Sequence, residues 1–278
     1  MQKKLWTGMF SHAILCVGVL IIGFPIYMAL IASTHTAQDM ASWPIPLTPG
    51  KHFLDNYAAA LGGAEKGMSV SRMLWISLIS ALCIAVGKII ISLMSAFALV
   101  YFNFRFKMAV FWGIFITLML PVEVRIVPTF EVVANLGMLN SYSGLTIPLI
   151  ASATATFLFR QFFKTIPNEI VEAAKVDGAG PIRFLLHILI PLSATSIAAL
   201  FVIQFIYGWN QYLWPLLIST NEDMYPVVVG IKRMMPAGDS QTEWNIIMAT
   251  AILAMTPPLL LVLFMQKWFV KGLVESEK

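Results

Sequence analysis

Three ionisable side chains lie within long apolar stretches of this chain: Lys88, Glu123 and Arg125. Charges in such stretches are costly and usually face a pathway or a partner. At 1.5 Å per residue, Lys88 lies roughly 20 Å from the end of its stretch near Tyr101, and Glu123 roughly 22 Å from the start of its stretch near Ala109. The matching depths favour a structural Lys88–Glu123 pair. Arg125 would then offer its guanidinium to a phosphorylated or carboxylated solute, with a structural role as the equal alternative.

Prolines flank the two charges of the later stretch, since Pro121 and Pro128 enclose Glu123 and Arg125. A proline removes a backbone donor and kinks or breaks a helix. Broken helices at membrane depth occur where they line a water-filled cavity or are covered by protein. The sequence therefore predicts a translocation pathway here.

A second polar group comes from Gln204, Tyr207 and Gln211, whose i, i+3, i+7 spacing predicts one shared helix face. Asn210 and Trp214 border this face. Amides within a membrane often join helices by hydrogen bonds. An aromatic ring with amides also suits a hydroxyl-rich solute, because the ring packs on C–H groups while the amides bond the hydroxyls. Helix joining and contact with a polyol or sugar are both open.

Membrane helices are the elements that must position these groups. The 278 residues are 59% hydrophobic and 12% charged, against about half apolar and about a quarter charged in soluble proteins. A membrane-spanning helix needs roughly 20 apolar residues. The sequence therefore predicts an all-α membrane protein with six transmembrane helices in a single domain, residues 1–278. The predicted spans are residues 12–33, 74–101, 109–128, 141–160, 193–216 and 245–266.

Basic residues predict which side of the membrane each loop faces. One side holds Lys3, Lys4, Arg105, Lys107, Arg160, Lys164, Lys175, Arg183, Lys267, Lys271 and Lys278, and the other holds Lys51, Lys66, Arg72, Lys232 and Arg233. Basic residues favour the cytoplasm, so both termini and the loop 161–191 are predicted to be cytoplasmic. The long loops 34–73 and 217–244 then face outward. The net charge of +4 reflects this topology and indicates no nucleic-acid partner.

The cytoplasmic loop has the chemistry of two short helices joined by a glycine turn. Pro167 suits a first helical position, Gly178 the left-handed conformation that ends a helix, and Pro181 the start of the next helix. The first helix is predicted to place an apolar face in a groove of a partner. That face consists of Ile170, Val171, Ala173, Ala174 and Val176.

The sequence contains no motif for catalysis or phosphate binding. Its histidines, His12, His35, His52 and His187, are scattered and form neither a His-Glu-x-x-His pair nor a metal-ligand set. It also lacks the Gly-x-x-x-x-Gly-Lys-Ser/Thr loop. We therefore expect a protein that is not an enzyme and holds no metal or cofactor, so that any energy from ATP must arrive through another subunit.

Residues 172–191 resemble the EAA loop of bacterial ABC import permeases. The pattern of that loop is Glu-Ala-Ala, three residues, Gly, nine residues and Ile-x-Leu-Pro, and Ile190 replaces its Leu here. The resemblance implies that residues 172–178 form a coupling helix between spans four and five that inserts into a cytoplasmic ATPase. An ordinary amphipathic helix is the alternative. The residues implied in coupling are Glu172, Ala173, Ala174, Asp177, Gly178 and Pro191.

The chain is further similar to the carbohydrate-importer branch of ABC permeases, through GWNQYLWPL at 208–216, YPVVVG at 225–230 and FVKGL at 269–273. Residues 116–125, 151–163 and 272–278 resemble permease subunits for sn-glycerol-3-phosphate and glycerophosphodiesters. These resemblances imply a multi-pass inner-membrane subunit that forms a heterodimer with a second permease. They also imply a homodimeric ATPase, which binds ATP and Mg, and a periplasmic solute-binding protein that the loop 217–244 reaches.

Three functions compete. An importer of a glycerol phosphate requires Arg125 or Lys88 to face the pore. An importer of a neutral, maltose-like sugar requires contacts from Gln204, Tyr207 and Asn210 instead. An ATP-independent transporter or channel would usually show its own inverted repeat, and the pattern at 172–191 argues against it.

Overall fold

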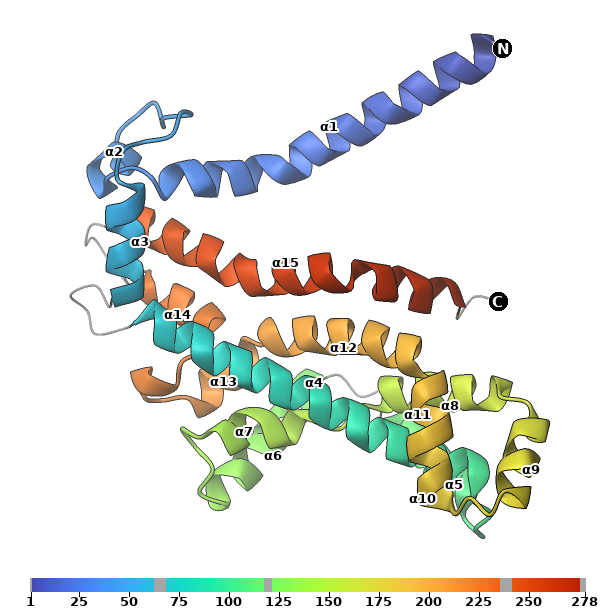
Figure 1. Cartoon of the computed structure of the whole chain (residues 1–278). Helices are drawn as coiled ribbons and strands as arrows, with labels where there is room; N and C mark the ends of the chain where they lie inside the picture. Colours follow the sequence, from blue (N-terminus) through green and yellow to red (C-terminus); the bar gives the residue numbers. More distant parts are fainter. Residues whose placement is uncertain (1, 63–68, 118–121, 236–241, 276–278) are drawn as a thin grey trace. The chain divides into compact units, whose positions relative to one another are not determined.

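Helices form the regular structure of the described residues, and no β-strand occurs among them, which confirms the all-α class. The computed structural model describes residues 2–62, 69–117, 122–235 and 242–275, and it describes side chains for residues 10–268 of these ranges except 122 and 123. The chain divides into two compact units, residues 1–74 with 227–257 and residues 75–226 with 258–278. Both can be followed in Figure 1.

A buried asparagine, Asn56, connects helices of the first unit by hydrogen bonds. This unit contains α1 (Gln2–Ala32), α2 (Ala37–Ala41), α3 (Phe53–Gly62), α14 (Val227–Met234) and the first residues of α4 (Val70–Tyr101) and α15 (Trp244–Glu275). Asn56 Nδ2 donates to the carbonyls of Ser33 (2.9 Å) and His35 (2.8 Å), and Asn56 Oδ1 accepts from Asn245 Nδ2 (2.9 Å). These bonds fix the end of α1 and the start of α15 to α3. The helix α3 lies within the loop 34–73, which the sequence predicts to face outward.

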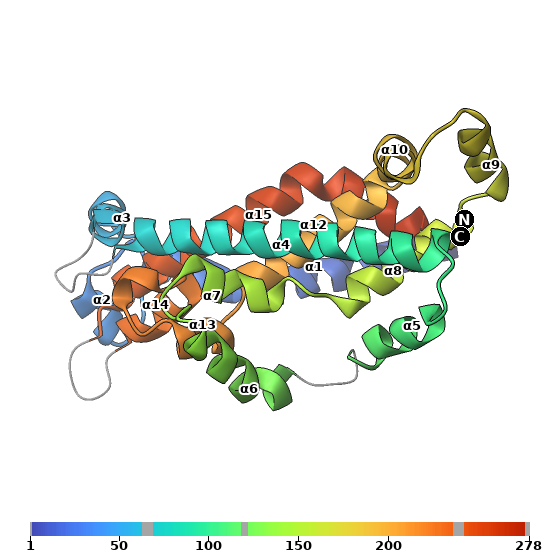
Figure 2. The same cartoon turned by 90° about the horizontal axis from the view of Figure 1, so that it is seen from below.

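The second unit is built along the remainder of α4. Its other helices are α5 (Lys107–Ile116), α6 (Val122–Asn135), α7 (Tyr142–Thr146), α8 (Ala153–Thr165), α9 (Asn168–Val176), α10 (Pro181–Phe184), α11 (Ile190–Leu192), α12 (Ala194–Trp209), α13 (Leu213–Ile218) and the part of α15 from Pro258 onward. A 3-10 turn (Ile147–Leu149) follows α7, a π-helical turn (Leu185–Leu189) joins α10 to α11, and another 3-10 turn (Glu222–Met224) follows α13. Figures 1 and 2 show α5, α9 and α10 at one end of α4 and α6, α7 and α13 toward the other.

Three predicted spans correspond to helices that are long and apolar enough to cross a membrane. Phe10–Ala32, Val70–Tyr101 and Trp244–Trp268 match the predicted spans 12–33, 74–101 and 245–266. If each of two bent helix pairs also counts as one span, the described residues offer up to five. The prediction of six spans is not confirmed.

The other three spans are not single straight helices. The predicted span 109–128 is divided, because α5 ends at Ile116 and α6 begins at Val122, while residues 118–121, including Pro121, lie outside the described residues. The span 141–160 is bent by 49° before α8, where Ser152 starts a new helix by accepting a bond from the Ala155 N–H. The helix α12 is bent by 77° from residues 181–192 and ends at Trp209, and α13 follows it, so the predicted span 193–216 holds parts of two helices and its end at 216 stays a prediction.

Candidate functional site

The predicted pair of short helices with a glycine turn is confirmed. The helix α9 starts at Asn168, one residue later than predicted, and α10 starts at Pro181. Gly178 has a φ of 70°, which favours glycine. The N–H groups of Gly178 and Ala179 donate to the carbonyls of Lys175 (3.0 Å) and Ala174 (2.9 Å). These bonds satisfy the end of α9 and reverse the chain toward α10.

The apolar face predicted for α9 is divided between the interior and the surface. Ala174 is buried and joins an apolar cluster of this unit with Ile170 and Val171, whereas Ala173 is exposed and Val176 is 87% exposed. The prediction that all five side chains face a partner is therefore wrong, because the helical repeat places three of them against their own chain. The exposed side, called the α9 outer face below, consists of Glu169, Glu172, Ala173, Lys175 and Val176.

Aromatic side chains that the sequence analysis missed attach this region to α4. The ring of Tyr101 lies edge-on to that of Phe184, with centroids 5.3 Å apart, and 6.1 Å from that of Phe163. The Tyr101 hydroxyl donates to the carbonyl of Phe163 (3.2 Å), and Phe163 is fully buried. Because Ile170, Val171 and the buried Ala174 pack on the same cluster, it connects α9 to α4, α8 and α10. The only signal in the sequence is the concentration of aromatic residues near these helix ends.

The structure brings two of the predicted pathway residues together. Lys88 on α4 is buried, and its Nζ lies 3.4 Å from the centroid of the Tyr207 ring on α12. Gly208 permits this approach, because a Cβ at that position would lie 3.0 Å from the Cα of Ala81 in α4. The negative face of the ring offsets part of the cost of a cation in this environment.

Arg125 adds a second cation to this region. It is exposed on α6 and lies close enough to Lys88 for the two charges to interact electrostatically. The side chain of Glu123 lies outside the described residues, so the Lys88–Glu123 pair stays a prediction. The like charges of Lys88 and Arg125 repel each other, and an anion beside both would lower their energy. In the described part of the chain, no group of three His, Cys, Asp or Glu side chains is placed to hold a metal ion.

The predicted amide face is shorter than expected. Gln204 is buried on α12, one turn before Tyr207. The helix then stops, so Asn210 is its exposed C-cap, and Gln211 lies beyond it with Nε2 donating to the carbonyl of Tyr207 (3.0 Å). Trp214 belongs to α13 and is buried there. The prediction that Gln211 and Trp214 continue or border the helical face is wrong, because that face ends with α12.

The sequence also did not predict a group of hydrogen bonds between Asn140 and the residues after α13, which is called the polar latch below. Asn140 has a φ of 51°, and its Oδ1 accepts from the N–H groups of Thr220 (2.7 Å) and Asn221 (2.9 Å). Its Nδ2 donates to Thr220 Oγ1 (2.8 Å). Nearby, Trp214 Nε1 donates to the carbonyl of Gly144 (3.0 Å). These bonds fix the start of the loop after α13, for which the sequence predicts only that it belongs to the outward loop 217–244.

Comparisons with known proteins give a family, full-length relatives and a fold. Residues 88–275 match the family model described as binding-protein-dependent transport system inner membrane component. The sn-glycerol-3-phosphate transport system permease protein UgpE of Brucella melitensis biotype 1 is 58% identical over 280 residues, which cover 100% of this chain and 99% of that protein. The protein of the same name from Escherichia coli O1:K1 is 54% identical over 279 residues with the same coverage.

A solved structure shares the fold. It is the crystal structure of a bacterial ABC transporter involved in the import of the acidic polysaccharide alginate, with a TM-score of 0.80 and 21% sequence identity. The match covers 97% of this chain and 98% of that chain. At this identity the likeness shows the fold alone.

Proposed function

Because this chain belongs to the family of binding-protein-dependent transport system inner membrane components, we propose that it is the permease subunit of an ATP-driven importer for sn-glycerol-3-phosphate or glycerophosphodiesters. The observation that carries the proposal is the 58% identity, over the whole chain, to a permease protein named for sn-glycerol-3-phosphate transport. Membership of the family makes the chain a transport component of the inner membrane rather than an enzyme, and it argues against an ATP-independent channel.

The family implies a partner permease, an ATPase and a binding protein. In our proposal the two permeases form a heterodimer, a homodimeric ATPase binds ATP and Mg, and the binding protein is periplasmic. The chain crosses the membrane six times as one domain, with both termini in the cytoplasm. The positions of α9 and α13 toward opposite ends of α4 support a cytoplasmic loop 161–191 (Figure 2). The loops 34–73 and 217–244 then lie on the side of the binding protein.

The α9 outer face contacts the ATPase in this proposal. Glu172 and Ala173 on this face are exposed, as such a contact requires, and so is Asp177, which follows the helix, whereas Ala174 is buried and Gly178 forms the turn. Pro191 lies in α11, on the segment that leads from the turn to α12. Closure of the ATPase would displace α9, and the cluster of Tyr101, Phe163 and Phe184 would pass that displacement to α4 as alternating access.

Lys88 and Arg125 bind the phosphate of the cargo in this proposal. A phosphate monoester carries about −1.5 to −2 charges at neutral pH, and two neighbouring cations suit such a dianion. A phosphate oxygen could replace the Tyr207 ring as the partner of Lys88, since a charge-assisted hydrogen bond contributes about 1.5–3 kcal/mol and a cation–π contact about 0.5–2 kcal/mol. Gln204, Tyr207 and Asn210 would bond the glycerol hydroxyls, while Gln211 caps α12.

Import into proteoliposomes that contain both permeases, the ATPase and the binding protein tests this function. We expect uptake of labelled sn-glycerol-3-phosphate and none of maltose. Arg125→Gln should lower the uptake by about tenfold or more, the effect of one lost charge-assisted bond, and Arg125→Lys should retain part of it. Uptake of maltose alone would contradict the proposal and favour the neutral-sugar importer.

A further inference from the structure

An apolar loop follows α2 and lies beside the C-terminal end of α1 (Figure 1). Its apolar side chains are Trp43, Ile45 and Leu47, and residues 40–50 contain no Asp, Glu, Lys, Arg or His. Trp43 is 88% exposed and Leu47 is 57% exposed. Residues 43–47 are called the Trp43 loop below. This loop has no part in the proposed pathway or in the α9 outer face.

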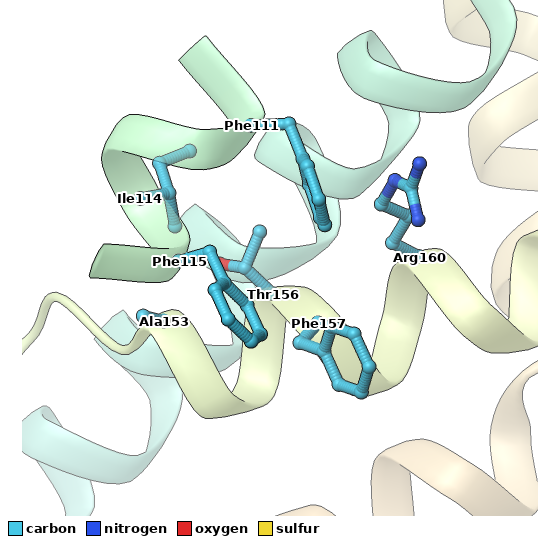
Figure 3. Close-up of a pocket in the computed structure, with 7 residues that line it drawn as sticks. All are labelled: Phe111, Ile114, Phe115, Ala153, Thr156, Phe157 and Arg160. Carbon is cyan, nitrogen blue, oxygen red and sulfur yellow. The ribbon is translucent and has the colours of Figure 1, made fainter. Parts of the chain in front are cut away.

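The aromatic side chains between α5 and α8 show how unusual this exposure is. Figure 3 shows the rings of Phe111, Phe115 and Phe157 gathered in one pocket. The ring centroids of Phe111 and Phe115 are 6.0 Å apart, and those of Phe115 and Phe157 are 5.9 Å apart. These rings cover one another within the chain. Trp43, in contrast, leaves most of its surface to surroundings outside the chain.

Contacts with α1 show how far the Trp43 loop reaches back along a predicted span. The Tyr27 hydroxyl donates to the carbonyl of Leu47 (2.7 Å). Ile45 lines an open groove of about 410 Å³ together with Pro25. The apolar stretch of α1 ends at Ala32, and at 1.5 Å per residue Tyr27 lies roughly 7.5 Å before that end. The Trp43 loop therefore lies alongside the last turns of a helix that is apolar enough to cross the membrane.

The start of α15 gives the same depth independently. Trp244 and Met248 line the same groove as Ile45, and Trp244 is the first residue of the apolar stretch of α15. The groove thus marks the level at which one apolar helix ends and another begins. Tryptophan is enriched where a membrane meets water. Segments that lie on a membrane bury their apolar side chains about 5–10 Å into the boundary between head groups and acyl chains.

The backbone of this region suits such a boundary. Residues 44–49 include three prolines, which have no N–H, so fewer donors lose water when the loop enters an apolar environment. The carbonyl of Leu47 accepts from Tyr27, and the carbonyl of Thr48 lies 2.8 Å from Nε2 of His35. Irregular backbone is tolerated at a membrane where its polar groups are satisfied.

We propose that the Trp43 loop is a membrane anchor, whose Trp43 and Leu47 side chains lie among the phospholipids of the outer leaflet at the level of the head groups. Ile45 fills the groove of its own chain, and the bond from Tyr27 ties the anchor to α1. The choice of leaflet rests on the topology of the proposed function, but the anchor does not rest on its cargo.

Spin labels on the assembled complex in liposomes test this proposal. A nitroxide is attached to Trp43→Cys, Leu47→Cys or Gln38→Cys in a complex that carries Cys16→Ser and Cys83→Ser and no other reactive cysteine. Oxygen concentrates among acyl chains and a nickel chelate stays in water, so the ratio of their collision rates with the label reports its surroundings. The ratio should be several-fold higher for Trp43→Cys and Leu47→Cys than for the matched control Gln38→Cys, which is exposed on α2.

Three results would overturn the proposal. A ratio for Trp43→Cys as low as for Gln38→Cys would place the loop in water. Low collision rates with both reagents would mean that protein covers the loop. A nickel rate that falls only when the binding protein is added would assign the loop to that partner. Subunit content and thermal stability identify a variant that fails to assemble, and the other labelled position then decides. Because the measurement needs no transport, its failure is distinct from failure of the import assay.

Discussion

The two ends of the second unit are held together by different forces. At the α9 end, the rings of Tyr101, Phe163 and Phe184 fill a buried cluster. At the α13 end, the side chain of Asn140 fixes a loop by hydrogen bonds to Thr220 and its neighbour. A close-packed cluster transmits displacement, whereas hydrogen bonds near the surface can exchange with water or a partner. We therefore expect the α9 end to transmit displacement from a partner. At the α13 end, we expect the loop to change its hydrogen bonds when a binding protein contacts it.

The largest expected effect is on the packing of the α9 end. Phe163→Ala would leave a cavity in the cluster, and a buried Phe→Ala change costs about 3–5 kcal/mol of unfolding free energy. Detergent unfolding of the purified subunit measures this loss. The matched control is Leu158→Ala on the same helix, where the side chain is 42% exposed. Equal destabilisation by the two variants would contradict the role of the cluster.

Charge reversal on the α9 outer face should separate coupling from folding. Glu172→Arg places the wrong charge in the proposed ATPase contact, at a cost of about 2–5 kcal/mol of binding. We expect loss of the ATPase from the purified complex and loss of import, with unchanged stability of the subunit. Glu131→Arg makes the same reversal at an exposed position on α6 and should leave ATPase binding intact. If it removes the ATPase equally, the outer face has no special role.

The polar latch should respond to the side chain of Asn140 and to its backbone separately. Asn140→Gly keeps the positive φ but removes three side-chain bonds, with an expected loss of about 2 kcal/mol. Asn140→Asp keeps the acceptor for Thr220 and Asn221 and should lose less. Hydrogen exchange of the Thr220 and Asn221 amides measures the difference. Protection that survives in Asn140→Gly would show that the latch does not hold this loop.

The smallest expected effect concerns the contact between Lys88 and Tyr207, which lies between the two ends of the second unit. A double-mutant cycle with Lys88→Gln and Tyr207→Leu isolates the cation–π contact, for which we expect a coupling of about 0.5–2 kcal/mol in stability. Lys88→Arg is the conservative control. A coupling of zero would mean that the contact adds nothing to the packing of α4 and α12.

Much of this molecule could be predicted from patterns within single segments of the sequence. Features that depend on contacts between segments could not be predicted. The glycine turn at Gly178 was predictable because the φ requirement is local, and the long apolar helices were predictable from composition. The end of α12 was not predictable, because apolar residues continue to Leu217 although the helix ends with Asn210 as its C-cap. The division of the α9 face also depends on Phe163 and Phe184, which the pattern of α9 does not contain. Lys88 and Tyr207 were predicted as candidates, but their contact depends on the close approach at Gly208.

We expect cargo recognition beside Tyr207 and coupling at α9 to be separable functions of one subunit. The most direct test measures ATP hydrolysis and sn-glycerol-3-phosphate import in the same proteoliposomes for wild type and Lys88→Gln. We expect that the loaded binding protein still stimulates hydrolysis in Lys88→Gln, while import falls about tenfold, the effect of one lost charge-assisted bond. An equal fall in hydrolysis and import, or no fall in either, would contradict this expectation.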